Sequence, residues 1–463
     1  MNWGVVFIGM LPENLLLLGI LLLIVNEIVS DRPSGASAYS LVIVAAAAVA
    51  AAWLGLTGYS AVPFAGQFSV SPTGSLAKAA VLALALPVLL MCRDDSEDSG
   101  PLYPLLLSSL YGLIIMLSAD SFLTLFLGLE LMSLPVYVLV MLARRRPQST
   151  EAALKYLVLG GAATATLLMG MTMLYGWSGN LSLANFGRAL GSHDPMAIAG
   201  AAMILLAFFL KAAVVPFHTW APDAYEGASV PVTAYMAALI KAGAVLATLR
   251  LFGQTALSGT MVDLLAVLPL ASIVWGNLAA MRQDNLRRMM AYSSIAHAGY
   301  LFYAFLGNGP GRFQAVMFYL VAYGLMTLLA FAVVPRHADD QQRDQLEQLK
   351  GLFHRQPYAA IVIGLSMLSL AGIPPLPGFI GKFLIFREVM AAGYTLYAVL
   401  GLVGSYLGIY FYLRVIQFMF MTPQAVTTSG ETPPRSAALL ASALCLVPAL
   451  YVAIFPGRIL AIL

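Results

Sequence analysis

The sequence predicts an all-α polytopic membrane protein with about 14 transmembrane helices, arranged as two inverted five-helix repeats with broken helices 7 and 12. Of its 463 residues, 60% are hydrophobic and 10% are charged, and the mean hydropathy is +0.87. A soluble domain carries about 25% charged residues, so this chain lacks the polar surface that water on all sides requires. Apolar stretches run from end to end, and we therefore expect a single membrane domain over residues 1–463.

Composition excludes several other classes of protein. Disorder requires low hydrophobicity and high charge. The two cysteines, Cys92 and Cys445, form no CxxC pair, so we expect no metal site and no iron–sulfur cluster in this chain. No glycine-rich phosphate loop follows a strand, and a net charge of +3 is too small to favour nucleic acid as a partner. No Lys or Arg precedes Arg32, so the N-terminal apolar stretch is expected to be a spanning helix rather than a cleaved signal peptide.

A transmembrane helix requires about 20 mostly apolar residues, and the lipid bilayer is therefore the first expected partner. The expected spans are 10–29, 38–58, 76–92, 103–118, 121–143, 152–176, 195–214, 229–253, 261–281, 290–306, 312–335, 358–391, 393–421 and 436–458. Prolines interrupt two of the helical regions, because proline removes a backbone donor and its ring collides with the preceding turn. They are Pro216 at helix 7, and Pro374, Pro375 and Pro377 in helix 12.

The distribution of the 24 Lys and Arg residues predicts the orientation in the membrane. With the N-terminus outside, 14 of them fall on the cytoplasmic side and six on the opposite side, and an even number of helices then places both termini in the periplasm. The longest polar stretch, His337 to Gln356, is too short for a domain. Its segment DQLEQLKGLF predicts a short amphipathic helix on the cytoplasmic surface.

Five ionisable residues lie inside apolar segments: Glu130, Lys211, Lys241, His297 and Lys382. An ionisable group at bilayer depth costs roughly 2.5–3.5 kcal/mol on insertion scales, so it must be paired, hydrated or used. Glu130 and Lys211 could simply neutralise each other. Three buried lysines against one glutamate are a poor basis for static pairing, which favours a functional role for Lys241 and Lys382.

His297 and three further residues have both a structural and a functional interpretation. His297 could be a proton carrier, or it could be hydrogen-bonded to Ser293 or Ser294 about one helical turn away. His218 lies beside the break at Pro216 and is a candidate supporting residue, as is Ser294. Arg414 also belongs to this supporting group, although an arginine close to the cytoplasmic end of its helix is more often an anchor.

Ionisable residues recur along the chain at a nearly constant spacing. The spacings are 167 residues from Glu130 to His297, 171 from Lys211 to Lys382, and 173 from Lys241 to Arg414. The pairs fall on expected helices 5 and 10, 7 and 12, and 8 and 13. Because each unit has an odd number of helices, the second must enter the membrane from the opposite side. We therefore expect inverted repeats over 103–253 (helices 4–8) and 261–421 (helices 9–13).

Buried Glu, Lys and His residues at membrane depth are suited to moving protons. A carboxylate that moves toward or away from a buried lysine changes the lysine's proton affinity by roughly 4 kcal/mol. Moving one charge against about 180 mV costs a similar amount. A shift of Glu130 relative to Lys211 therefore has the energy scale of a pumping step.

Several motifs resemble the antiporter-like subunits of respiratory complex I (NADH:quinone oxidoreductase). They are LGLELMSLPVYVL, EAALKYLVLGG, LKAAVVPFHTWAPDAYEGASVPVTAYMAALIKAG, QDNLRRMMAYSSIAHAGYLF and LAGIPPLPGFIGKF. The resemblance spans about residues 105–420. EAALKY and the expected helix number are most similar to the N-type members. Lysine at position 382 favours N- or M-type members, and the lack of a long C-terminal lateral helix argues against the L type.

The resemblance implies that Glu130 and Lys211 are the partners on helices 5 and 7, that Lys241 is the central lysine of helix 8, and that Lys382 is the residue of helix 12. It also implies proton translocation from Lys211 to Lys241 and, by way of His297, to Lys382. The expected partners are the other membrane-arm subunits of a complex in the bacterial inner membrane. NADH, FMN, iron–sulfur clusters and quinone would belong to partner chains, with no cofactor in this one. The rival interpretations are an Mrp-type cation/proton antiporter subunit and a scaffold that keeps the charges without pumping.

Overall fold

The structure is a computed structural model that describes residues 3–29, 35–94, 101–143, 148–252, 257–335, 344–421 and 436–462. The described chain is almost entirely helical, which confirms the expected all-α class. Several arginines on which the predicted orientation depends lie outside the described residues: Arg32, Arg144, Arg145, Arg146, Arg336, Arg343 and Arg435.

The described residues of the first half form twelve α-helices, a short hairpin and one π-helical turn. In order they are α1 (Trp3–Gly9), α2 (Leu11–Val29), α3 (Ala36–Leu56), β1 (Ala61–Phe64), β2 (Phe68–Val70), α4 (Pro72–Asp94), α5 (Leu102–Leu117), α6 (Phe122–Met141), α7 (Ser149–Ser178), α8 (Ala184–Leu190), α9 (Pro195–Lys211), α10 (Trp220–Gly227), α11 (Val230–Tyr235), η1 (Met236–Ile240) and α12 (Lys241–Leu251).

The described residues of the second half form ten α-helices and two short 3₁₀ turns. In order they are α13 (Gly259–Met281), α14 (Leu286–Tyr303), η2 (Ala304–Leu306), α15 (Gly311–Ala332), η4 (Leu346–Leu349), α16 (Leu352–Arg355), α17 (Pro357–Ala371), α18 (Pro377–Ala391), α19 (Thr395–Leu407), α20 (Ile409–Met421), α21 (Ser436–Ile454) and α22 (Pro456–Ile462).

Ten helices or helical runs in the described residues are long and apolar enough to span a membrane. An eleventh span results if α8 and α9, which meet at 115°, are taken together. The helices α5 and α17 are apolar but shorter than this criterion requires. Each of the fourteen expected segments nevertheless falls on one or two of the observed helices.

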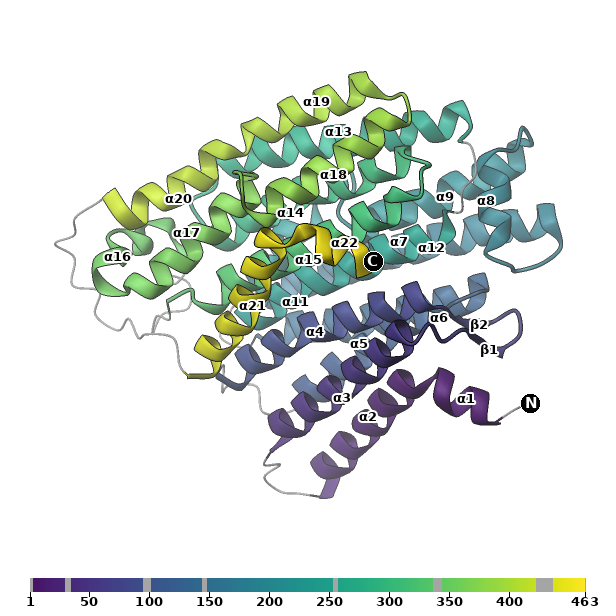
Figure 1. Cartoon of the computed structure of the whole chain (residues 1–463), viewed down its shortest axis with the longest axis horizontal. Coiled ribbons are helices and arrows are strands. Elements are labelled where there is room, and N and C mark those ends of the chain that lie inside the picture. Colours follow the sequence, from purple (N-terminus) through teal and green to yellow (C-terminus); the bar gives the residue numbers. More distant parts are fainter. Residues whose placement is uncertain are drawn as a thin grey trace.

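Neighbouring helices in the sequence also pack against each other in space. The closest pairs are α3 with α4, α5 with α6, α7 with α9, and α13 with α14. In Figure 1 the N-terminal helices α1–α3 form one edge of the molecule, and α19 and α20 form the opposite edge. The interior between them contains α11, η1, α12, α14 and α15, and α15 and the run from α11 to α12 are almost completely buried.

Three local features differ from the sequence-based expectation. Instead of an amphipathic helix at 344–353, the structure has η4 and α16, separated by Gly351 with φ +67°. That left-handed backbone interrupts a right-handed helix. The expected span 393–421 is divided into α19 and α20 at Gly408, and the antiparallel hairpin of β1 and β2 lies in a loop where no strand was expected.

The two helical regions in which breaks were expected, at Pro216 and at Pro374 to Pro377, are interrupted. The helix α9 ends at Lys211 and α10 begins at Trp220, so Pro216 lies in the connecting segment. Similarly, α17 ends at Ala371 and α18 begins at Pro377, with Gly372 between them at φ +89°. Each interruption leaves the last carbonyl groups of one helix without partners in the next turn, and these groups become available to side chains.

Candidate functional site

Glu130 and Lys211 lie together between α6 and α9. The Lys211 ammonium is 3.5 Å from Glu130 Oε1, a looser ion pair than direct hydrogen bonding would give. Thr164 on α7 donates to the same carboxylate oxygen at 2.6 Å. Lys211 also donates to Ser133 Oγ at 3.3 Å and to the Tyr137 hydroxyl at 3.2 Å. Each charged group therefore has neutral polar partners in addition to the ion pair.

Lys211 is the last residue of α9. The C-terminus of a helix carries a partial negative charge, which stabilises a cation placed there. The next residue, Ala212, hydrogen-bonds back to Phe208, and Ala213 adopts the left-handed conformation with φ +60°. The break thus places the lysine where the backbone turns away and the helix dipole ends.

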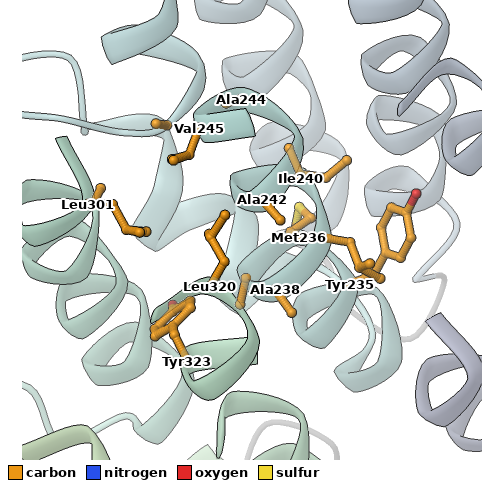
Figure 2. Close-up of a cluster of buried hydrophobic side chains, with 14 of the residues drawn as sticks. Tyr235, Met236, Ala238, Ile240, Ala242, Ala244, Val245, Leu301, Leu320 and Tyr323 are labelled. Atoms are coloured by element: carbon orange, nitrogen blue, oxygen red, sulfur yellow. The ribbon is translucent and has the colours of Figure 1, made fainter. Parts of the chain in front are cut away.

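Lys241 lies deep in the molecule, at the junction between η1 and α12. Single π-helical turns within α-helices occur frequently at functional positions. Lys241 is 4% exposed and donates to both the carbonyl and the hydroxyl oxygen of Ser294 on α14. Figure 2 shows the apolar side chains around this junction, including Ile240 and Ala242 on either side of the lysine in sequence.

His297 lies one turn beyond Ser294 on α14. Its Nδ1 is 2.5 Å from the Tyr319 hydroxyl, and its Nε2 is 3.1 Å from the Tyr412 hydroxyl. Both ring nitrogens therefore contact hydroxyl groups that can donate or accept a proton. The histidine does not use Ser293 or Ser294 as its partner; Ser293 instead contacts the Tyr412 hydroxyl at 2.5 Å.

Lys382 uses the second helix break. Its ammonium donates to the carbonyl groups of Leu370 and Ala371, the last two residues of α17, at 3.0 and 3.1 Å. A third hydrogen bond reaches Ser405 Oγ on α19 at 3.0 Å. The lysine also lines a cavity of about 270 Å³ between α18 and α19, whose other walls are largely apolar. It is therefore a cation held by dipoles at the edge of a mostly apolar space.

Aromatic rings connect Lys241 to Lys382 through His297. The Lys241 ammonium is 5.0 Å from the Tyr323 ring centroid, and that ring is 4.7 Å from the His297 ring. The His297 ring is 5.5 Å from the Tyr300 ring, which the Lys382 ammonium approaches to 4.8 Å. Attraction between a cation and a π-system is worth roughly 0.5–2 kcal/mol, so these rings partly replace the lost hydration of the lysines.

The structure does not bring the supporting residues Arg414 and His218 into this set. Arg414 on α20 donates to the carbonyl groups of Met281 and Gln283 and pairs with Asp284 at 2.5 Å, so it anchors the end of α13. His218 accepts a hydrogen bond from Trp275 at 3.0 Å, in a partly exposed position beside Pro216. Ser294, the third supporting residue, is the one in direct contact with a buried lysine.

A buried ion pair near the N-terminus was not expected from the sequence. Glu13 on α2 and Lys78 on α4 are 2.5 Å apart, and both are almost completely buried. Phe68 of the unexpected hairpin covers the lysine, with the ring centroid 5.1 Å from the ammonium. Glu13 and Lys78 each lie near the end of an apolar segment, where a charge is usually assumed to reach water, so sequence position alone gave no signal of burial.

The described residues contain no group of three or more His, Cys, Asp or Glu side chains that could bind a metal ion. Cys92 on α4 and Cys445 on α21 are both buried and unbridged. Two cysteines on different helices do not make up the four-cysteine ligand set of an iron–sulfur cluster.

Comparison with known proteins supports the resemblance found in the motifs. A family model described as "NADH:quinone oxidoreductase/Mrp antiporter, TM" matches residues 119–408. The NADH-quinone oxidoreductase subunit N of Pelobacter propionicus is 39% identical, covering 89% of this chain and 88% of that protein. Its counterpart in Trichlorobacter lovleyi is 37% identical over 94% and 92% of the two chains.

Solved structures agree at the level of the fold. A chain of respiratory complex I from Thermus thermophilus, determined with bound aureothin, is 34% identical, with a TM-score of 0.82 and coverage of 97% of this chain and 98% of that chain. A chain of the Mrp complex from Dietzia has the same fold at 24% identity, with a TM-score of 0.83 and coverage of 98% and 96%. This chain therefore belongs to the NADH:quinone oxidoreductase/Mrp antiporter transmembrane family, as a relative of the NADH-quinone oxidoreductase N subunits.

Proposed function

We propose that this chain is a proton-translocating membrane-arm subunit of NADH:quinone oxidoreductase. In this role it couples electron transfer from NADH to quinone, carried out by partner chains, to proton movement through its own buried Glu, Lys and His residues. NADH, FMN, the iron–sulfur clusters and quinone then bind to those partners. The relatives named as N subunits, matched over about nine-tenths of both chains, support this assignment.

The main support for the proposal is that two lysines are buried without a carboxylate partner in the described residues. Lys241 and Lys382 are buried, and within the described residues neither forms an ion pair with a carboxylate. Their hydrogen-bond partners there are the hydroxyl and carbonyl groups of Ser294, Leu370, Ala371 and Ser405. A static buried cation normally has a counter-charge, because the desolvation penalty is otherwise several kcal/mol. A lysine that is neutral for part of a cycle avoids that penalty.

The arrangement supports a relay with two parts. Glu130 and Lys211 form the first part, in which the separation of carboxylate and ammonium controls how tightly the lysine holds its proton. Lys241, His297 and Lys382 form the second part, connected by tyrosine rings and hydroxyl groups. The helix breaks beside Lys211 and Lys382 supply backbone dipoles and room for water at depths where continuous helices would be dry.

The proposal also includes the location of the chain. We place it in the bacterial inner membrane with both termini in the periplasm, and with the proton entering from the cytoplasm near the break between α9 and α10. The distribution of Lys and Arg along the sequence supports that orientation. The rival function, an Mrp-type cation/proton antiporter, rests on a shared fold at 24% identity, whereas the N subunits reach 39%.

Replacing Lys241 tests the proposal. Lys241→Ala removes the relay amine, so we expect assembled complex whose NADH-driven proton pumping falls by roughly tenfold or more, the scale of a lost proton-transfer group. Lys241→Arg should be less damaging but still slow, because arginine keeps its proton at every physiological pH. Pumping is measured with a pH-sensitive dye in vesicles that contain the purified complex.

Lys350→Ala is the matched control, since this lysine lies in a surface turn and pairs with Glu347 at 3.0 Å. It should pump normally. Full activity of Lys241→Ala in assembled complex would refute the relay and favour the scaffold interpretation. Purification of a hydrophobic assembly without flavin or iron would favour the antiporter.

A further inference from the structure

The hydrogen-bond network around Lys241 includes Tyr225, a residue that the proposed relay does not use. Ser294, which accepts both hydrogen bonds of the lysine, also contacts the Tyr225 hydroxyl through its own Oγ at 3.0 Å. Tyr225 is 2% exposed and lies on α10, the short helix that follows the first break. A line of hydroxyl groups therefore runs from α10 to the central lysine.

The same short helix carries partly exposed charges. Asp223 and Glu226 on α10 each contact Arg288 at 2.8 Å, and Asp223 also pairs with Lys155 on α7 at 2.7 Å. These residues line a cavity of about 110 Å³ with Glu151. We refer to Glu151, Lys155, Asp223, Glu226 and Arg288 as the α10 charge cluster. It contains three acids and two bases, so it attracts protons and water.

Helix geometry gives the axial separation between Arg288 of this cluster and Ser294, the hydrogen-bond partner of Lys241. Arg288 and Ser294 lie six residues apart on α14, which at 1.5 Å per residue corresponds to about 9 Å along the helix. A few hydrogen-bonded water molecules cover that distance. Asp223 and Tyr225 are separated by a single residue on α10, so this helix reaches from the partly exposed cluster to the buried hydroxyl groups.

We propose that Tyr225 and Ser294 form a hydroxyl relay that loads Lys241 with protons from water at the α10 charge cluster. In each transfer a hydronium ion gives a proton to Tyr225 Oη while Tyr225 gives its own proton to Ser294 Oγ. Ser294 simultaneously gives its proton to the neutral amine of Lys241. One O–H bond forms and one breaks at each hydroxyl, both hydroxyls end neutral, and the single positive charge passes from hydronium to the lysine.

This inference rests on the proposed function and extends it, because it gives Lys241 a route to the cytoplasmic side that does not pass through Lys211. Tyr225 would then be a proton-transfer residue in its own right. A purely structural interpretation is that the tyrosine hydroxyl only satisfies Ser294. The two interpretations differ in what happens when the hydroxyl alone is removed.

Tyr225→Phe and Tyr235→Phe form a matched pair. Both tyrosines are buried, and each contacts a serine hydroxyl, but Tyr235 donates to Ser109 at 2.7 Å on α5. In Figure 2 Tyr235 points away from the side of the helix that faces Tyr323. We expect Tyr225→Phe to lower proton pumping by roughly tenfold in assembled complex and Tyr235→Phe to leave it unchanged. The solvent deuterium isotope effect on coupled turnover should change for Tyr225→Phe alone.

Ser294 supplies a second test that does not depend on the tyrosine variant folding. Ser294→Ala should lower pumping and Ser294→Thr, which keeps a hydroxyl, should restore much of it. The double variant Tyr225→Phe/Ser294→Ala should be no worse than Ser294→Ala, because both substitutions interrupt one route. Additive losses, or pumping and an isotope effect in Tyr225→Phe equal to those in Tyr235→Phe, would overturn the relay.

The Lys241→Ala variant separates the two proposals. If Lys241→Ala pumps normally, the proposed function itself fails. If Lys241→Ala is impaired while Tyr225→Phe is normal, the proposed function stands and protons reach Lys241 by another route.

Discussion

Glu130 is held by two contacts that differ in kind. Thr164 donates a neutral hydrogen bond at 2.6 Å, whereas Lys211 lies 3.5 Å away as an ion pair. At an effective dielectric constant of 20, two unit charges about 4 Å apart attract each other by about 4 kcal/mol. The hydrogen bond can therefore keep the carboxyl group in place while changes in the ion pair control the proton on the lysine.

Glu130→Gln separates these two contacts. Glutamine keeps an oxygen that accepts from Thr164 and keeps the size of the side chain, but it removes the charge that Lys211 responds to. We expect the complex to assemble, with proton pumping and coupled quinone reduction reduced severalfold. Both are measured on purified complex in vesicles.

Glu347→Gln is the control for Glu130→Gln. Its side chain is 75% exposed and pairs with Lys350, three residues further along the chain, an interaction that contributes little to stability. Normal pumping in assembled Glu130→Gln would contradict the role of the charge. If Glu130→Ala prevents assembly while Glu130→Gln is silent, the pair is structural.

At the scale of single residues, the sequence predicts the charged members of the site better than their neutral partners. A lysine in an apolar segment stands out, because its burial is costly. Tyr137, Thr164, Tyr300, Tyr319 and Ser405 do not stand out, because tyrosines, serines and threonines occur throughout such helices. Their roles depend on which helices are neighbours, and single-sequence periodicity does not contain that information.

At the scale of helices, each of the two breaks places the C-terminus of a helix beside a lysine. Lys211 ends its own helix, and Lys382 binds the last carbonyl groups of the preceding one. In both cases a lysine lies at the negative end of a helix dipole, which stabilises its charged form. Lys211 also has Glu130 as a counter-charge, whereas Lys382 has no carboxylate partner among the described residues. This arrangement depends on the backbone turning sharply just after the helix.

Gly372 is the residue at which this turn can be tested. It has φ +89°, and a Cβ atom there would lie 3.2 Å from both Cδ and Nζ of Lys382. Gly372→Ala therefore strains the backbone by about 1–2 kcal/mol and also pushes against the lysine. We expect assembled complex with a lower inactivation temperature and reduced proton pumping.

Gly364→Ala on the same helix is the matched control. A Cβ atom at position 364 would be 3.5 Å from the Phe420 ring, an ordinary contact, and the backbone there is helical. Alanine inside a helix is favoured over glycine by roughly 0.5–1 kcal/mol, so this variant should be neutral or slightly more stable. Equal behaviour of the two variants would show that the turn at Gly372 tolerates a side chain.

The positions of the helices were predictable because a long apolar segment is a strong signal. The places where helices are interrupted were harder to predict from the sequence. Pro216 and the cluster that begins at Pro374 indicate where two of the helices break. Gly351 and Gly408 did not indicate a helix boundary in the same way, since glycine is common inside membrane helices. Residues distant in sequence help to hold the hairpin of β1 and β2. Ser69 donates hydrogen bonds to Ser118 and to Asp120, and Gln67 accepts one from Ser121. The formation of the hairpin therefore depends on tertiary contacts.

At the scale of the molecule, the inverted repeat expected from the sequence would relate the two broken helices. Lys211 and Lys382 lie 171 residues apart, each beside a break and each contacting a tyrosine and a serine. Arg414 does not match Lys241 in the same way, because it anchors α13 through Asp284. The repeat is therefore expected to preserve the breaks and their lysines more closely than every charged position.

An inverted repeat makes a geometric prediction about depth in the bilayer. Its pseudo-twofold axis lies in the membrane plane, so a residue near that plane is carried to a partner at the same depth. We expect the ammonium groups of Lys211 and Lys382 to lie within about 10 Å of each other in depth, near the centre of a hydrocarbon core about 30 Å thick. An experimental structure of the complex in a lipid nanodisc, with both headgroup layers visible, measures each depth directly. A larger difference would separate the two lysines between interface and centre. The constant spacing in sequence would then reflect regular helix lengths rather than a repeat. The route by which water reaches each lysine would also have to be explained separately.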